Sequence, residues 1–338
     1  PLTVSETVIM KICVVGAGAI GGWMGTHLAR LPDVQLSVLA RGETLKALRQ
    51  HGLRLSDAQG EHTAQVIASD RATELGPQDL VVLAVKAPAL QEVVPQLAPM
   101  LTKTTRVLTA MNGVPWWFLQ GFGGAWANRS LSSVDPQGRL SQALPAGQII
   151  GCVVHSSCAV RSAGHVQHHF GNGLIIGEPS GHNSAATQHV YQWLCDAGFQ
   201  ATLSPCIQQD TWYKLWGNMT MNPVSAFTGA TADRVLADPL VREFISSVML
   251  EAKAIGNLLG LKIDQQPEDR HAVTQKLGAF KTSMLQDVEA GRAIELDALV
   301  GAVQELGQLT GVATPFTNAL LGLSRLHGRV HGLYPEAA

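Results

Sequence analysis

Three polar side chains recur at four-residue intervals within residues 211–223: Lys214, Asn218 and Asn222. On an α-helix this spacing places them on one face. An ammonium group can stabilise a developing oxyanion and donate a proton, and amide groups can bind hydroxyl groups. The adjacent residues are apolar, which weakens the alternative of a solvated helix face: Trp212, Leu215, Trp216, Met219 and Met221. We interpret the face as a polar ligand site, and expect the helix to kink or stop near Asn222 because Pro223 follows.

A second polar group occupies residues 281–297, and its residues have two interpretations. Ser283 begins a Ser-Met-Leu-Gln sequence with the spacing of a capping box, so it could simply cap a helix. Glu295 and Asp297 could favour the dipole of a helix that begins near them. Spacing alone does not decide between helix capping and a part in a ligand site.

A glycine-rich motif follows the apolar run at residues 12–15, with the sequence Gly16-Ala17-Gly18-Ala19-Ile20-Gly21. Gly16 permits a tight turn, Gly18 lets the backbone approach a pyrophosphate, and Gly21 lets the following helix pack closely on the strand. The pyrophosphate would lie on the free amides and the positive dipole end of that helix. The motif therefore predicts a dinucleotide site.

Arg41 indicates which dinucleotide is bound. It follows the next apolar run, residues 36–40, and stands twenty residues after the last glycine of the motif. An NAD site usually has Asp or Glu at this place, whereas a guanidinium suits the 2′-phosphate of NADP. We therefore predict NADP(H) as the cofactor.

Two further expected strands, residues 81–85 and 106–110, are followed by polar residues. Lys86 follows the first and Asn112-Gly113 the second, and ligands bind at the carboxyl ends of parallel strands. We expect Lys86 and Asn112 to face the cofactor. A solvated loop lysine and a simple Asn-Gly turn are the alternatives.

The order of these elements predicts an α/β protein, with an N-terminal Rossmann-type doubly wound sheet and a C-terminal all-helical domain. Strand and helix signals alternate up to residue 110, and long helical periods follow residue 205, at 241–259 and 293–309. The irregular stretch 115–147, rich in Trp and Gly, is typical of a lid or binding loop.

The expected domains are an N-terminal extension (residues 1–9), a nucleotide-binding domain (10–205) and a helical substrate domain (206–330). The helical domain could form a homodimer, although the same apolar faces would also serve an internal core.

Composition excludes several classes of protein. With 46% hydrophobic and 15% charged residues and a net charge of −2, the 338-residue chain has no basic surface for nucleic acid or anionic membranes. No apolar run approaches the roughly 18 residues of a membrane span, and residues 1–10 do not resemble a signal peptide. Five cysteines without a CxxC pair predict a reduced, cytoplasmic protein. We interpret His165, His168 and His169 as packed or surface residues and predict no metal site.

Taken together and in this order, the motifs resemble those of the ketopantoate reductase (2-dehydropantoate 2-reductase) family of the 6-phosphogluconate dehydrogenase-like superfamily. The resemblance extends from Lys11 to about Leu323. Its markers are Gly16-Ala-Gly18-Ala-Ile-Gly21, Val85-Lys86, Asn112-Gly113, Lys214-x3-Asn218-x3-Asn222-Pro, Ser283-Met-Leu-Gln-Asp287 and Gly291-Arg-x-x-Glu295.

The resemblance implies NADPH-dependent reduction of 2-dehydropantoate to pantoate, a step of pantothenate and coenzyme A biosynthesis. By position, Lys214 would be the general acid, and Glu295 would hold the lysine and the new hydroxyl in place. The remaining implied roles are substrate binding by Asn112, Asn218, Asn222 and Ser283, and cofactor binding by residues 16–21, Arg41, Lys86 and Asn112.

The chain departs from the family at residues 116–144, which exceed the compact connection usual after the Asn-Gly turn and could reshape the substrate pocket. The alternative function is therefore reduction of another small 2-keto acid with the same Lys/Glu site. A non-enzymatic NADP(H) sensor is disfavoured because a sensor needs no proton donor.

Overall fold

The computed structural model describes residues 9–336. The chain divides into two compact units, of which unit 1 comprises Pro1–Met111 and Leu140–Ile207, and unit 2 comprises Asn112–Arg139 and Gln208–Ala338. The predicted extension at residues 1–9 falls, except for Ile9, outside the described residues.

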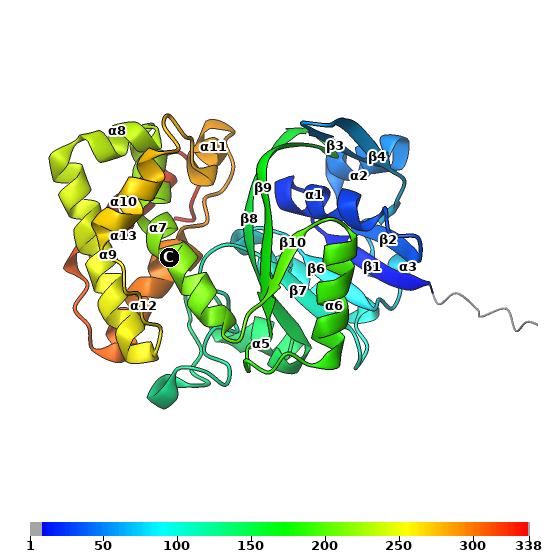
Figure 1. Ribbon diagram of the computed structural model, residues 1–338, viewed down its shortest axis with the longest axis horizontal. Helices are drawn as coiled ribbons and strands as arrows, with labels where there is room; N and C mark the ends of the chain where they lie inside the picture. The colour runs from blue at the N-terminus through cyan, green and yellow to red at the C-terminus, as the bar shows by residue number, and fades with distance from the viewer. Residues whose placement is uncertain (1–8, 337–338) are drawn as a thin grey trace, which may run out of the picture. The chain divides into compact units, whose positions relative to one another are not determined.

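A mixed sheet forms the centre of unit 1 (Figure 1). Its described strands are β1 Met10–Val15, β2 Val34–Leu39, β3 Leu53–Asp57, β4 Gly60–Ala64, β5 Ile67–Ser69, β6 Leu80–Leu83, β7 Arg106–Ala110, β8 Ile149–Ser162, β9 His165–Gly177 and β10 Gln200–Leu203. They are arranged in the order β4-β3-β9-β8-β7-β6-β1-β2-β5, with β10 paired to β9. Within this order, the neighbouring strands β8-β7-β6-β1-β2-β5 are all parallel, which confirms the predicted Rossmann-type arrangement.

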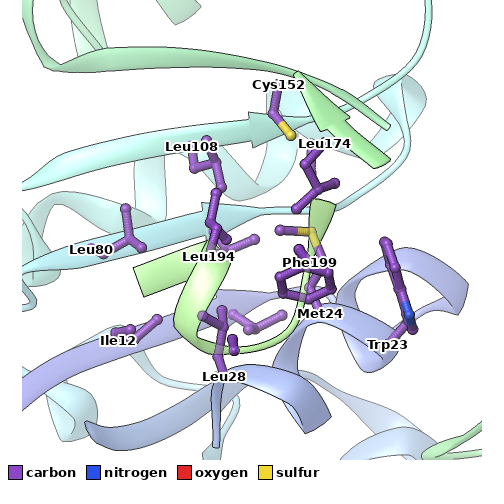
Figure 2. Close-up of a cluster of buried hydrophobic side chains, with 14 of the residues drawn as sticks. Ile12, Trp23, Met24, Leu28, Leu80, Leu108, Cys152, Leu174, Leu194 and Phe199 are labelled. Atoms are coloured by element: carbon purple, nitrogen blue, oxygen red, sulfur yellow. The ribbon is translucent and has the colours of Figure 1, made fainter. Parts of the chain in front are cut away.

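Continuous apolar runs produce the central strands, because a parallel sheet covered on both faces needs apolar side chains in both directions. All four residues of β6 are buried, as are the last four of β1 and of β2. Figure 2 shows one core cluster, in which Trp23 and Met24 of α1 and Leu194 of α6 pack with sheet residues such as Leu108 and Leu174.

The helices of unit 1 are α1 Ala19–Leu28, α2 Gly42–His51, α3 Ala72–Leu75, α4 Leu90–Val93 and α6 Ala185–Asp196, with 3-10 turns η1 Ala87–Ala89, η2 Val94–Met100 and η5 Ala146–Gln148. A further short helix, α5 Arg139–Ala143, begins where the chain re-enters this unit.

The hairpin of β8 and β9 is longer than the short strands that the sequence suggested for residues 150–204. Two of the histidines on it are packed. His165 is buried and bonds the Ser56 hydroxyl at 2.8 Å, and His168 stacks on Trp23 with 5.7 Å between ring centres. Among residues 9–336, no group of three His, Cys, Asp or Glu side chains is placed to hold a metal ion.

Helices make up the regular structure of unit 2 over its described residues, as expected. They are η3 Gly124–Trp126, η4 Pro136–Gly138, α7 Ile207–Thr228, α8 Ala232–Ala237, α9 Pro239–Leu259, α10 Pro267–Gln275, α11 Ser283–Glu289, the π-helix η6 Asp297–Gly301, α12 Ala302–Thr310 and α13 Pro315–Val330. In the part of the chain that the structure describes, no helix is long and apolar enough to cross a bilayer.

Of the two expectations for α7 near Asn222, a kink or a stop, the stop is wrong, because the helix runs through Pro223 to Thr228. A proline inside a helix costs about 3 kcal/mol. The following turn offsets this cost by packing, since Val224, Ser225 and Ala226 are all buried.

Residues 112–139 group with unit 2, whereas the sequence placed them in the nucleotide-binding domain. Their aromatic side chains are core residues: Trp116, Trp117 and Phe118 are buried, and the Phe118 ring packs on Trp212 of α7 at 5.8 Å. The Glu305 carboxylate accepts the backbone amides of Ser132 and Ser133 at 2.7 and 2.9 Å. The segment is thus packed into unit 2, and a role as a lid or binding loop stays a prediction.

Candidate active site

The glycine motif forms the turn between β1 and α1, and each of its glycines is required or tolerated for a different structural reason. Gly16 has φ of +89°, which L side chains rarely adopt. A Cβ on Gly21 would lie 1.9 Å from the Gly16 carbonyl oxygen, so only glycine lets α1 approach the strand this closely. A Cβ on Gly18 would meet no atom within 4 Å, which leaves open space beside the backbone at this residue.

A cavity of about 300 Å³ adjoins this turn within unit 1. It is lined by the motif residues 15–18, by the end of β2 and by Thr44 at the start of α2. Three features of this cavity fit a dinucleotide phosphate. They are the free backbone donors of a helix N-terminus, the open space beside Gly18 and a positively charged side chain.

Arg41 is the positively charged side chain of this cavity. It stands directly before α2 and lines the cavity, with its side chain 70% exposed. Its guanidinium forms a two-pronged ion pair with Glu92 of α4, and this hydrogen bond raises the pKa of Arg41. A phosphate bound at Arg41 would therefore compete with the Glu92 carboxylate for the guanidinium. The sequence analysis did not identify Glu92. Lys86 begins the 3-10 turn η1 that leads to α4.

In unit 2, α7 presents the predicted polar face. Lys214 and Asn218 are half-buried and Asn222 is only 6% exposed, so the face is not a solvated one. The Trp216 side chain holds the opposite side of the helix by donating to the Met249 carbonyl at 2.8 Å.

The structure brings Lys214 together with Asn112, 102 residues away in the sequence. The Lys214 Nζ donates to Asn112 Oδ1 at 2.8 Å. Gly113 follows with φ of +81°, so this segment does form the turn that Asn-Gly suggested, and the turn also directs the Asn112 amide to the lysine. The turn packs tightly, since Val114 N donates to the Ala298 carbonyl at 2.8 Å.

Glu295 lies in the irregular segment directly before the helical residue that leads into η6, and it is buried, with only 9% of its surface exposed. The preceding turn is fixed by Asp287, which is buried and accepts from Arg292 Nε at 3.0 Å. Asp297 accepts from the Tyr334 hydroxyl at 2.7 Å.

Ser283 is the first residue of α11, but Thr282 is its N-cap, accepting the amide of Leu285 at 3.2 Å. The capping alternative for Ser283 is therefore wrong, and Ser283 is exposed. Thr282 and Ser225 of α7 are bonded through their hydroxyls at 2.6 Å. Because Ser225 donates its single proton to the Asn222 carbonyl, Thr282 must be the donor between them. This series of hydrogen bonds connects the start of α11 to the turn of α7 that carries Asn222.

Several residues that support the site were missed at the level of sequence. Glu92, Ser225, Thr282 and Tyr334 act through contacts with residues far away in the chain. Only Thr282 carried a usable local signal, because threonine is a preferred N-cap.

Unit 1 has a glycine turn beside a cavity of about 300 Å³, and unit 2 has a half-buried lysine held by an amide. Together these features define the class of Rossmann-type oxidoreductases. The family model "Ketopantoate reductase PanE/ApbA" matches residues 12–181, and the model of its C-terminal domain matches residues 206–327. The chain belongs to the ketopantoate reductase family.

Individual relatives agree with this assignment. A 2-dehydropantoate 2-reductase of Mesorhizobium japonicum is 42% identical over 96% of this chain and 100% of its own length. A crystal structure described as a candidate ketopantoate reductase of Ralstonia solanacearum MolK2 is 51% identical, with a TM-score of 0.91 over 96% of this chain and all of its own. D-mandelate dehydrogenase in complex with NADH, at 20% identity and a TM-score of 0.82 over 96% of this chain and all of its own, shows the same fold. The protein is thus an oxidoreductase of small keto acids that uses a nicotinamide cofactor.

Proposed function

We propose that the protein reduces 2-dehydropantoate to pantoate with NADPH, and that Lys214 donates the proton. The carrying observation is the bond from Lys214 to Asn112, which fixes a half-buried ammonium beside two further amides on the same helix. The 42% identity to a 2-dehydropantoate 2-reductase over nearly the full length supports this substrate.

Each residue has a defined part in the proposed reaction. When bound, NADPH supplies a hydride to the carbonyl carbon. Negative charge then develops on the carbonyl oxygen, which the Lys214 ammonium stabilises before it transfers its proton there. Asn112 orients the ammonium, and the buried Glu295 holds Lys214 and the new hydroxyl.

The substrate-binding roles are those that the family implies for the remaining polar residues of unit 2. Asn218 and Asn222 of α7 bind the distal hydroxyl group. Ser283, the exposed first residue of α11, binds near the carboxylate.

The glycine turn and its cavity would hold the cofactor, with residues 16–21 binding the pyrophosphate. Arg41, which lines the cavity, and Lys86, which directly precedes η1, would bind the 2′-phosphate. Asn112 would serve as a further cofactor-binding residue, a role that the family implies for it.

The test is NADPH oxidation, followed at the absorbance of reduced nicotinamide, with 2-dehydropantoate as the substrate and NADH as the control cofactor. Rapid turnover with NADPH supports reaction, cofactor and substrate together. A panel of other small 2-keto acids tests the alternative substrate, and a clearly higher kcat/KM for any of them would contradict 2-dehydropantoate as the substrate.

Replacing Arg41 should shift cofactor preference. We expect Arg41→Ala to weaken NADPH binding by about tenfold and NADH binding by less than about twofold, since only NADPH carries the phosphate. Titration of protein fluorescence with each nucleotide measures both dissociation constants. The matched variant Glu92→Gln should strengthen NADPH binding by a few-fold, because it removes the competing carboxylate. An unchanged NADPH/NADH preference in Arg41→Ala would refute the assignment of this residue.

We further propose that the protein is a homodimer that associates through α13. The exposed residues Phe316, Ala319, Leu323, Leu326 and Val330 follow a three- and four-residue spacing, as in helices that pack on another helix. A fold neighbour from Staphylococcus aureus, 20% identical, is described as a dimeric ketopantoate reductase.

A charge in the middle of this face should dissociate the dimer. We expect Leu326→Glu, at a residue 60% exposed in the chain alone, to give a monomer by size-exclusion chromatography with light scattering. Gln275→Glu adds the same charge at an exposed position of α10 and should leave the mass unchanged. A wild-type monomer at micromolar concentration would contradict the proposal.

A further inference from the structure

Residues 333 and 334 contact the segment that carries Glu295. The Ile294 amide donates to the Leu333 carbonyl at 3.0 Å, and the Tyr334 hydroxyl donates to Asp297 Oδ1 at 2.7 Å. These bonds lie one residue before and two residues after Glu295. The backbone at Glu295 is therefore held on both sides by the same short stretch of chain.

Tyr334 is itself fixed against α13. The Leu333 amide donates to the Gly328 carbonyl at 2.7 Å, and a Cβ on Gly328 would lie 2.6 Å from the Cβ of Tyr334. The Arg329 guanidinium lies 5.6 Å from the centre of the tyrosine ring. Burial and the bond to Asp297 raise the pKa of Tyr334, so the hydroxyl keeps its proton at neutral pH and remains a donor.

Asp297 connects Tyr334 to the segment that contacts Lys214. It begins the π-helix η6, an element that often occurs at functional sites. The next residue, Ala298, accepts the Val114 amide at 2.8 Å, and a Cβ on Gly113 would lie 2.7 Å from the Cβ of Ala298. The Asn112 side chain, directly before this contact, accepts from Lys214. A continuous series of bonds and contacts therefore joins Tyr334 to Lys214, all of it within unit 2.

We propose that Tyr334 is a positioning residue for the proton transfer, and that its bond to Asp297 sets Glu295 and the Asn112–Lys214 pair in one geometry. This inference rests on the proposed function. Because proton transfer requires hydrogen-bond distances, a shift of a few tenths of an ångström in this segment affects kcat. The residues proposed to bind the substrate in its ground state, Asn218, Asn222 and Ser283, belong to α7 and α11 and not to this segment.

The test compares steady-state kinetics of four variants. We expect Tyr334→Phe to lower kcat by about tenfold while KM for 2-dehydropantoate changes by less than about twofold. Asp297→Ala should reproduce this loss. Asp297→Asn keeps an oxygen acceptor at Oδ1 and should retain most of the activity, which a general loss of stability would not explain. Tyr191→Phe alters a tyrosine of α6 in unit 1 and is the matched control, with unchanged kcat.

Hydrogen exchange provides a readout that does not depend on the substrate. In Tyr334→Phe, the amides of Val114 and Ile294 should exchange faster than in the wild-type protein, whereas amides of α9 should not change. Wild-type protein that fails to reduce 2-dehydropantoate would refute the proposed function. The exchange experiment would still test whether the bond from Tyr334 to Asp297 holds this segment in place. Unchanged exchange at both amides, or a Tyr334→Phe variant whose KM rises while kcat is preserved, would overturn the positioning role.

Discussion

Lys214→Ala is expected to lower kcat for keto acid reduction by roughly 10² to 10⁴-fold, the usual contribution of a positioned general acid. The variant loses both the ammonium that stabilises the developing oxyanion and the proton it delivers. NADPH binding should persist, because the glycine turn and Arg41 are not altered. Stopped-flow or steady-state absorbance of reduced nicotinamide gives kcat, and fluorescence titration gives the dissociation constant.

Lys262→Ala is the control for this experiment. Its side chain is 79% exposed and forms an ion pair with Asp264, and it belongs to the same unit as Lys214. It should leave kcat, KM and the NADPH dissociation constant unchanged. Normal turnover in Lys214→Ala would show that another group donates the proton and that the proposed mechanism is wrong.

Gly21→Ala is expected to have the largest effect on the fold and on the nucleotide site together. The new Cβ would lie 1.9 Å from the Gly16 carbonyl oxygen, and a backbone atom cannot move away as the end of a flexible side chain can. Overpacking of this kind costs about 3 kcal/mol and displaces the turn that holds the pyrophosphate. Urea denaturation measures the loss of stability, and fluorescence titration measures the loss of NADPH affinity.

Gly18→Ala separates these two effects. A Cβ at Gly18 meets no atom of the chain within 4 Å, and φ of −74° is accessible to alanine, so the free energy of unfolding should change by less than about 0.5 kcal/mol. NADPH affinity should still fall, because the methyl group takes space proposed for the pyrophosphate. If Gly21→Ala bound NADPH and unfolded as the wild-type protein does, the close-packing argument would be refuted.

The sequence alone determined the features that depend on local periodicity or on single-residue geometry. Apolar runs predicted β1, β2, β6 and β7, because central parallel strands need continuous apolar residues. The glycine spacing predicted the turn before α1. The four-residue period of Lys214, Asn218 and Asn222 predicted a shared helix face, and α7 indeed carries all three.

Other features were decided by tertiary packing, and local signals were misleading for them. Pro223 suggested the end of a helix, yet buried packing carries α7 past it. The capping-box spacing suggested Ser283 as the N-cap, but Thr282, bonded to Ser225 of another helix, takes that place. The composition of residues 115–147 indicated a lid or binding loop, but it did not indicate that Trp116, Trp117 and Phe118 are core residues of unit 2.

The arrangement of the candidate site divides in the same way. The sequence by itself determined which groups are available: an ammonium, amides, a carboxylate and a dinucleotide motif. Only the tertiary structure decided that Asn112 bonds Lys214, and that Tyr334 and Asp297 hold the segment of Glu295. Periodicity records which side of one element faces the core, but it carries no information on which distant element meets that side. That pairing is fixed by the packing of whole helices and turns, as the contact between Gly113 and Ala298 illustrates.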